Sequence, residues 1–183
     1  NEQIVVCQKP FTGNMEYWTT PGFKWQWFGT LTTYYKTQQL WFGSNNDTEV
    51  QQGQPIKVTF NDASDGLIFG SMRVKLPTDE LHLSRIQTEY NGMDRLMNEL
   101  VKQTVVKVVY ASGPLMSGFE SYAEKKNDLI EYITDQLNNG VYKTTTTTVE
   151  TTDPITGEKK MVKVASLVED KDAPGGYKRS EQS

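Results

Sequence analysis

The sequence predicts an α+β fold, in which a twisted, mainly antiparallel sheet is followed by packed helices and a C-terminal β-hairpin. Over residues 1–76, apolar and polar residues alternate between turn signals, a period typical of half-buried strands. After Pro77 the apolar spacing changes to three and four residues, which indicates helices over 78–139. From 141 to 166 β-branched residues return on both sides of a Pro- and Gly-containing turn, which predicts the hairpin.

The first half of the chain is divided by turn residues. Phe11-Thr12-Gly13-Asn14 and Pro21-Gly22 predict two turns, and Asn61-Asp62-Ala63-Ser64-Asp65-Gly66 predicts the connection of a hairpin, with Asp-Gly as its strongest element. Between the second and third turns, Phe23, Trp25 and Trp27 alternate with polar residues, a pattern that puts three rings on one face. The other strands that the pattern predicts are residues 2–8, 15–18, 30–42, 56–60 and 67–76.

Three helices are bounded by capping and stop signals. Thr78 or Asp79 caps the first, which ends at Asn91-Gly92, and the second covers about 93–111. Ser117 caps the third, which ends at Asn138-Asn139-Gly140. We expect a domain over 2–140, a hairpin extension over 141–168 and a flexible tail over 169–183.

The composition of the 183 residues excludes several classes of protein. A net charge of −4 and a pI of about 5.1 argue against a nucleic-acid partner, which would favour a basic surface. Cys7 is the only cysteine and His82 the only histidine, so there is no basis for a disulfide framework or a thiolate zinc site. No nucleophile motif or phosphate-binding glycine loop is present, and we predict no enzymatic activity, cofactor or metal.

The two single residues have ordinary interpretations. Cys7 lies in a predicted strand, where a free cysteine is usually a small buried residue, although a lipidated or reactive thiol remains the alternative. His82 has no second ligand type beside it and fits a surface position better than a pH sensor.

The aromatic segment leaves two interpretations open. Phe23, Trp25, Trp27 and Phe28 lie at a lipid interface in the first, because amphipathic rings favour the headgroup region. In the second they pack inside the domain, because aromatic side chains dominate core energetics. No run of about 18 apolar residues is present to span a bilayer. The chain begins at Asn1, and we expect it to come from downstream of an N-terminal membrane anchor.

The order of these motifs resembles the SPFH or band-7 family, which includes stomatins, prohibitins, flotillins and bacterial regulators of a membrane-bound AAA protease. The resemblance covers roughly residues 2–140 and rests on an ordered set of short motifs. These are Glu2-Gln3-Ile4-Val5-Val6, Phe11-Thr12-Gly13, Pro21-Gly22-Phe23-Lys24-Trp25, Pro55-Ile56-Lys57-Val58-Thr59, Asp65-Gly66 and the helix from Asp128-Leu129-Ile130 onward. The hairpin at 144–163 is longer than the family pattern.

The resemblance implies a membrane-associated scaffold domain that forms a homo-oligomer, or a hetero-oligomer with related chains, and organises membrane proteins. It implies a lipid bilayer surface as a partner, touched by Phe23, Trp25, Trp27 and Phe28. Tyr122, Ile130 and Ile133 on the last helix are expected to contact neighbouring copies, and the Thr-rich hairpin offers free strand edges for addition. The alternatives are a regulator of a membrane protease and a soluble partner-binding module with the aromatic cluster as its groove.

Overall fold

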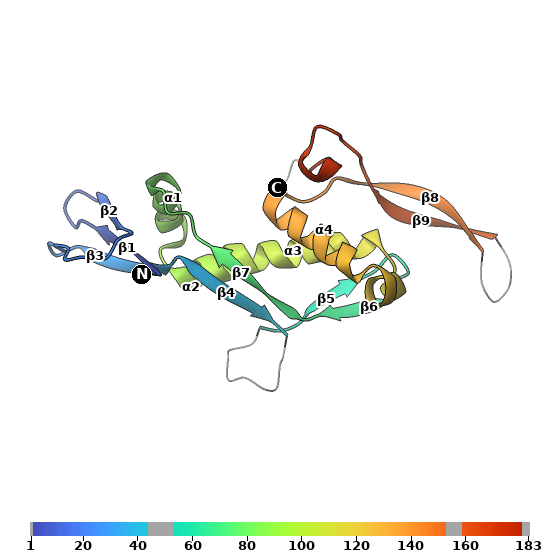
Figure 1. The fold of residues 1–183 in the computed structure, drawn as a ribbon, viewed down its shortest axis with the longest axis horizontal. Coiled ribbons are helices and arrows are strands. Elements are labelled where there is room, and N and C mark those ends of the chain that lie inside the picture. Colours follow the sequence, from blue (N-terminus) through green and yellow to red (C-terminus); the bar gives the residue numbers. More distant parts are fainter. Residues whose placement is uncertain (1, 44–52, 153–158, 181–183) are drawn as a thin grey trace. The chain divides into compact units, whose positions relative to one another are not determined.

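The computed structural model describes residues 2–43, 53–152 and 159–180 and confirms the α+β class (Figure 1). Small antiparallel sheets come first, then helices, then a C-terminal hairpin. The strands of residues 1–76 form three separate sheets, where the sequence predicts one, and the C-terminal hairpin forms a fourth. The chain divides into two compact units: unit 1 comprises residues 1–54 and 70–103, and unit 2 comprises 55–69 and 104–183.

The three-stranded sheet of unit 1 is centred on β1 (Gln3–Gln8), which lies between β2 (Met15–Trp18) and β3 (Thr30–Tyr35). Both neighbours are antiparallel to β1, and Gln8 lies opposite the first residue of β3. The β-branched residues Ile4 and Val6 are fully buried, as the predicted pleat requires. A second sheet pairs β4 (Thr37–Phe42) with β7 (Gly70–Lys75).

The helices of unit 1 follow the predicted signals. They are α1 (Glu80–Tyr90), α2 (Met93–Arg95) and a π-helical turn η1 (Leu96–Val101). Asp79 caps α1 by accepting the His82 backbone N–H at 3.1 Å, and Asn91 ends the helix in the left-handed conformation (φ 48°). The buried Tyr34 hydroxyl donates to Gln87 Oε1 at 2.7 Å, which joins the sheet to α1.

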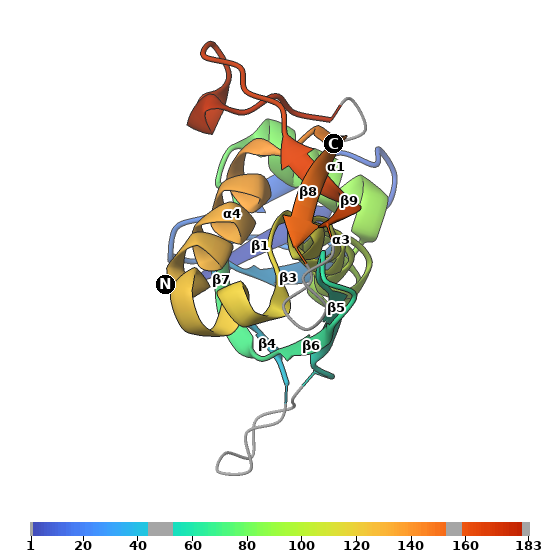
Figure 2. The ribbon, with the colours of Figure 1, turned by 90° about the vertical axis from the view of Figure 1, so that its right-hand side faces the viewer.

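Unit 2 contains a short β5–β6 hairpin and a pair of helices. Its elements are β5 (Ile56–Thr59), β6 (Asp65–Ile68), α3 (Lys102–Ser112), η2 (Gly113–Leu115), η3 (Glu120–Glu124) and α4 (Lys126–Asn139). A hydrogen bond joins α4 to the last residue of α3, where the buried Gln136 amide donates to Ser112 Oγ at 2.8 Å (Figure 2 shows both helices). Ser117 and Glu120 form a capping box, with each side chain accepting the other's backbone N–H.

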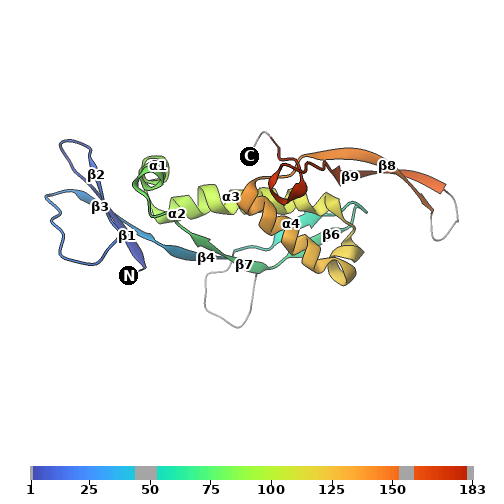
Figure 3. The same ribbon diagram turned by 45° about the horizontal axis from the view of Figure 1, so that its top comes forward.

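The predicted C-terminal hairpin is present as β8 (Thr144–Thr152) and β9 (Lys159–Leu167), two nine-residue strands in antiparallel register (Figure 3). Thr144 lies opposite Leu167, and Thr152 lies opposite Lys159. The predicted turn at Asp153–Gly157 lies outside the described residues.

Three strand predictions in the first half need correction, and one of them is the strand over 67–76, which is divided at Phe69 into β6 and β7. Residues 23–28 form an irregular loop rather than a period-2 strand, and Lys36 interrupts the predicted strand over 30–42. The Lys36 N–H donates to Glu2 O and its carbonyl accepts from Leu76 N at 2.9 Å, so β3 and β4 pair with different strands on either side of this residue. Period-2 alternation alone does not distinguish a strand from an extended loop that lacks a ladder partner.

The hairpin turn of unit 2 overlaps the predicted connection over 61–66, but Asp65-Gly66 is not part of it. Asp65 and Gly66 lie inside β6, and the chain turns over 60–64 with Ala63 at a φ of 61°. The Asp62 carboxylate accepts the Ser64 N–H at 3.0 Å, which stabilises this turn. A Cβ at Gly66 would lie 2.7 Å from a ring carbon of Phe60, so the glycine allows close packing instead of making the turn.

Residues 168–180 fold back beside the end of α4, where the sequence predicts a flexible tail (Figure 3). Arg179 Nη2 lies 2.7 Å from Asp135 Oδ2, and its guanidinium lies 4.6 Å from the ring centroid of Tyr142. The ring of Tyr177 packs edge-on against that of Tyr142 at 5.4 Å. We call Asp135, Tyr142, Tyr177 and Arg179 the clasp. Composition indicates a charged, Gly-containing tail, but it does not identify the partners that this segment finds on α4.

Candidate functional site: an exposed aromatic surface

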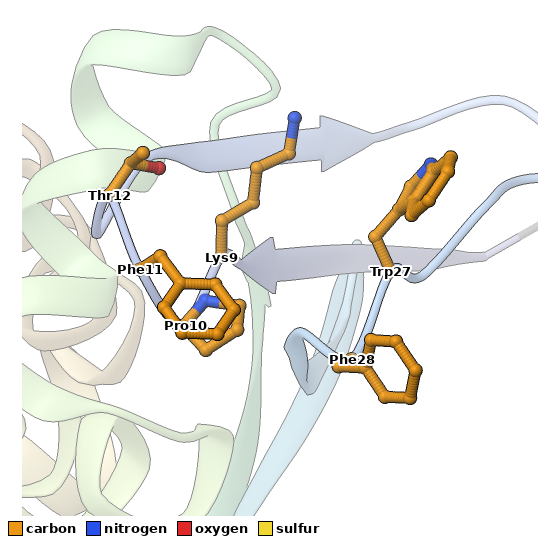
Figure 4. A pocket seen from close by; sticks show the side chains of 6 residues that line it. All are labelled: Lys9, Pro10, Phe11, Thr12, Trp27 and Phe28. Atoms are coloured by element: carbon orange, nitrogen blue, oxygen red, sulfur yellow. The ribbon is translucent and has the colours of Figure 1, made fainter.

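Two connections of the three-stranded sheet meet at one edge of unit 1. The β1–β2 turn follows Gln8, and the β2–β3 loop ends just before Thr30, which lies opposite Gln8 in the register. Figure 4 shows Pro10 and Phe11 of the turn on one side of a hollow, with Trp27 and Phe28 of the loop on the other. The hollow has a volume of about 560 Å³ and is also lined by Lys9 and Thr12.

The aromatic side chains at this edge are unusually exposed. The exposed fractions are 95% for Phe11, 86% for Phe23, 67% for Trp25, 68% for Trp27 and 92% for Phe28. We call these five residues the aromatic surface. Their exposure excludes the interpretation in which the rings of residues 23–28 pack in the core. Contiguous exposed apolar groups of this kind mark interaction sites in many proteins.

The rings of the loop contact one another in series. Phe23 and Trp25 lie 5.8 Å apart between centroids in an edge-on arrangement with an interplanar angle of 89°. Trp25 and Trp27 are also 5.8 Å apart, with their planes tilted by 35°. The loop therefore presents a connected aromatic strip, although its backbone is not a strand.

Backbone contacts hold this loop against β1. Gln26 Nε2 donates to the Gly29 carbonyl at 2.7 Å, and the Gly29 N–H donates to the Gln26 carbonyl at 2.9 Å. The Cys7 thiol donates to the same Gln26 carbonyl at 3.6 Å. A Cβ at Gly29 would lie 2.7 Å from Cys7 Sγ and 2.9 Å from the Gln8 carbonyl, so the loop can approach β1 only with glycine there.

Trp27 and Phe28 have left-handed backbone conformations, with φ values of 46° and 62°. Bulky residues adopt this region at an energetic cost, and such strain is concentrated at functional sites. The strained pair follows Gln26 and precedes Gly29, the two residues whose hydrogen bonds hold the loop. The contacts of the loop thus keep both rings directed away from the sheet.

Charged groups at this edge are few and partly neutralised. Lys9 forms an ion pair with Glu16, and this hydrogen bond lowers the pKa of the Glu16 carboxyl. Burial raises the pKa of the Cys7 thiol, which is fully buried, so Cys7 is a neutral hydrogen-bond donor rather than a reactive thiolate. The chemistry of the aromatic surface is therefore apolar contact.

The predicted oligomer contacts lie on η3 and α4 of unit 2. Tyr122 is 86% exposed and Ile130 is 54% exposed, whereas Ile133 is half-buried. Phe119 is exposed one helical turn before Tyr122, and the i, i+3 spacing of this pair could have identified it. From the sequence, the motif of Phe11 indicates only a turn, and it does not predict that this ring joins the aromatic surface.

His82, the only histidine, has a structural role. His82 Nδ1 lies 2.5 Å from Asp79 Oδ2 at the start of α1, and hydrogen bonds from the His82 side chain and backbone lower the pKa of the Asp79 carboxyl. Among the described residues, no group of three or more His, Cys, Asp or Glu side chains is positioned to hold a metal ion. Within the residues that the structure describes, no helix is both long enough and apolar enough to cross a bilayer.

Comparison of the chain with protein-family models, curated proteins and solved structures gives no significant match. The geometry of the aromatic surface and the motif resemblance are therefore the two observations that bear on function.

Proposed function

We propose that this chain is a membrane-associated scaffold domain of the SPFH or band-7 type, which rests on a lipid surface through Phe11, Phe23, Trp25, Trp27 and Phe28. The observation that carries the proposal is the exposure of five aromatic rings on neighbouring connections of one sheet. Tryptophan and other aromatic rings favour the region between lipid headgroups and acyl chains, where their apolar bodies leave water. In water the same rings have no apolar partner of this kind.

The energetics are sufficient for reversible binding. Moving apolar surface out of water stabilises by about 25 cal/mol per Å². Partial insertion of one large ring therefore contributes on the order of 1–2 kcal/mol, and several rings on one strip add to it. Because Lys9 is paired with Glu16 and the chain has a net charge of −4, this attachment does not depend on anionic lipids.

Self-assembly is the second part of the proposal. Tyr122 on η3 and Ile130 on α4 offer exposed apolar contacts, and copies gathered on a membrane would meet at high local concentration. An oligomer formed in this way would organise membrane proteins around it. If the organised protein is a membrane-bound AAA protease, the same surfaces would serve a regulator of that protease.

The test is co-sedimentation of the chain with vesicles of zwitterionic lipid. We expect the wild type to pellet and the Trp25→Ala/Trp27→Ala/Phe28→Ala variant to remain in the supernatant. The matched control is Leu67→Ala/Phe69→Ala, which removes two side chains of unit 2 that are 56% and 57% exposed. Circular dichroism checks that each variant is folded. A wild-type chain that stays in the supernatant would contradict direct lipid attachment by these residues.

The hollow between Phe11 and Phe28 favours a second candidate, a soluble module that binds a partner protein. Its volume of about 560 Å³ would accept one or two apolar side chains of such a partner. This candidate predicts that vesicles are not bound, and that the aromatic triple variant loses a protein complex that the Leu67→Ala/Phe69→Ala control retains.

A further inference from the structure

The two strands of the C-terminal hairpin differ in how their outer edges are protected. Lysine on an edge strand opposes the addition of another strand, and β9 carries Lys159 and Lys163. In β8, Glu150 is the only charged residue, five consecutive threonines come before Val149, and no proline interrupts the strand. Among the described strands, β8 pairs only with β9. The outer edge of β8 is therefore the unprotected edge of this hairpin.

Apart from the contact of β9 with η2, the hairpin has little to stabilise it. A two-stranded hairpin is marginally stable in water, and residues 143–150 are all exposed. Its cross-strand side-chain contacts include a Ser166–Thr147 hydrogen bond of 3.0 Å and a Lys159–Glu150 ion pair of 3.2 Å at exposed positions. Exposed contacts of this kind contribute little to stability. An added strand would satisfy the unpaired backbone groups along β8.

We propose that this added strand is β8 of a second copy of the chain, which pairs antiparallel with the first and gives a four-stranded sheet in the order β9–β8–β8–β9. The inference deepens the self-assembly part of the proposed function, and it does not depend on the lipid contact of the aromatic surface. In this arrangement the lysine-bearing β9 strands form the two outer edges, where they prevent further growth of the sheet.

The charge pattern favours the antiparallel direction, and full overlap of the two strands sets the register. A full overlap of the two nine-residue strands places Thr148 on the twofold axis, opposite the partner's Thr148. Glu150 then lies opposite the partner's Thr146, an uncharged residue. In a parallel, in-register pair Glu150 would lie opposite the partner's Glu150, and like charges directly opposite are destabilising. The antiparallel register avoids this repulsion.

Cysteine cross-linking tests the register. Thr148→Cys alone is expected to form a disulfide-linked dimer under mild oxidation, and so is an equimolar mixture of Thr146→Cys with Glu150→Cys chains. Each of the last two variants alone is expected to give no dimer, because four residues of offset separate the identical positions by about 13 Å, well beyond the reach of a disulfide. Native Cys7 is fully buried and does not compete.

The outcomes separate the alternatives. Cross-linking by all three single variants would indicate a parallel pair, and no cross-linking in solution or on vesicles would show that β8 does not meet itself. Either result overturns the proposal. The same cysteines in the aromatic triple variant keep the two proposals apart, because a dimer that forms without vesicle binding supports the β8 contact and contradicts only the lipid contact.

A charge substitution tests the contact without a covalent bond. In Thr148→Glu the new carboxylate lies opposite Lys163 of the same hairpin, so the hairpin is retained. Across the twofold axis, the same carboxylate lies opposite the identical carboxylate of the partner and is repelled by it. In Thr146→Lys the new ammonium lies opposite the partner's Glu150. We expect loss of the dimer in the first variant and its retention in the second, measured by light scattering. Equal masses for both variants would overturn the proposal.

Discussion

The aromatic surface of unit 1 and the β8 edge of unit 2 are both exposed, but they expose different chemistry. The first presents rings that are 67–95% exposed and has few charged groups around it. The second presents unpaired backbone donors and acceptors with short hydroxyl side chains. Rings need no directional partner, which suits a fluid lipid interface, whereas a strand edge needs a second strand in register. The kind of partner that each region can bind is therefore determined by its exposed groups, aromatic rings in one and backbone donors and acceptors in the other.

The two regions are also held in different ways. The aromatic loop is held by hydrogen bonds between neutral groups, centred on Gln26 and Gly29. The base of the hairpin is held by the clasp, where Arg179 donates to Asp135 and to the Gly140 carbonyl. Substitutions and pH should consequently affect one region without the other.

The largest expected effect is that of Arg179→Ala. The Arg179 and Asp135 side chains are only 13% and 18% exposed, so removing the cation leaves a largely buried carboxylate without its partner. We expect a loss of about 3 kcal/mol in the free energy of unfolding, measured with urea. Lys178→Ala, an exposed neighbour, is the control. Equal stability of the two variants would mean that the clasp does not hold the segment, and vesicle binding should be unchanged in both.

Gly29→Ala should be the most disruptive single change at the aromatic surface. The added methyl group would lie within 3.0 Å of Cys7 Sγ and of the Gln8 carbonyl, and such overpacking costs about 1–3 kcal/mol. We expect both lower stability and weaker vesicle binding, because the loop must move off β1. Thr30→Ala, at the adjacent exposed position, should change neither property. A fully stable Gly29→Ala chain would show that the loop is not held as described.

Acid should weaken the clasp before it affects the aromatic loop. Burial alone would raise the pKa of Asp135, but hydrogen bonds from Tyr142, Arg179 and Asn139 outweigh it and hold the pKa below its usual range. The stabilisation is therefore complete above about pH 4, the usual range of an aspartate, and is lost as the pH falls through the lower folded-state pKa. Hydrogen exchange at 141–143 and 177–180 should accelerate below pH 4 in the wild type. In Asp135→Asn the same amides should lose this pH dependence.

The smallest expected effect is that of Lys9→Ala. The Lys9 and Glu16 side chains are 38% and 43% exposed, and exposed ion pairs contribute little to stability. Vesicle co-sedimentation should be the same for this variant and the wild type, and it should be insensitive to salt. A strong loss of binding would indicate electrostatic attachment and would remove the contrast between apolar and directional surfaces.

Much of the fold could be predicted because local signals are strong. Asp79 and Asn91 bound α1 as expected, and the β-branched runs of β8 and β9 pair as expected. The irregular loop over 23–28 could not be predicted, because its alternation is that of a strand while its conformation depends on contacts with Cys7. The position of the hairpin turn at Ala63 likewise depends on Gly66 packing against Phe60.

The candidate site could be predicted in part. The residue types of Phe23, Trp25, Trp27 and Phe28 indicated either a core or an interface, and only their exposed fractions exclude the core. Phe11 joins them because β1 and β3 are neighbours, a long-range pairing that a local pattern does not contain. The clasp is not predictable from a local pattern either, because Asp135 and Arg179 are 44 residues apart.

The most direct measurement of the central claim is tryptophan quenching by brominated lipids. In a Trp18→Phe/Trp41→Phe chain, Trp25 and Trp27 are the only tryptophans and both belong to the aromatic surface. If the aromatic surface rests on lipid, the emission of Trp25 and Trp27 shifts to the blue on vesicles and is strongly quenched when the bromines lie near the headgroups. Unshifted, unquenched emission from this folded chain in the presence of excess vesicles would contradict this lipid contact.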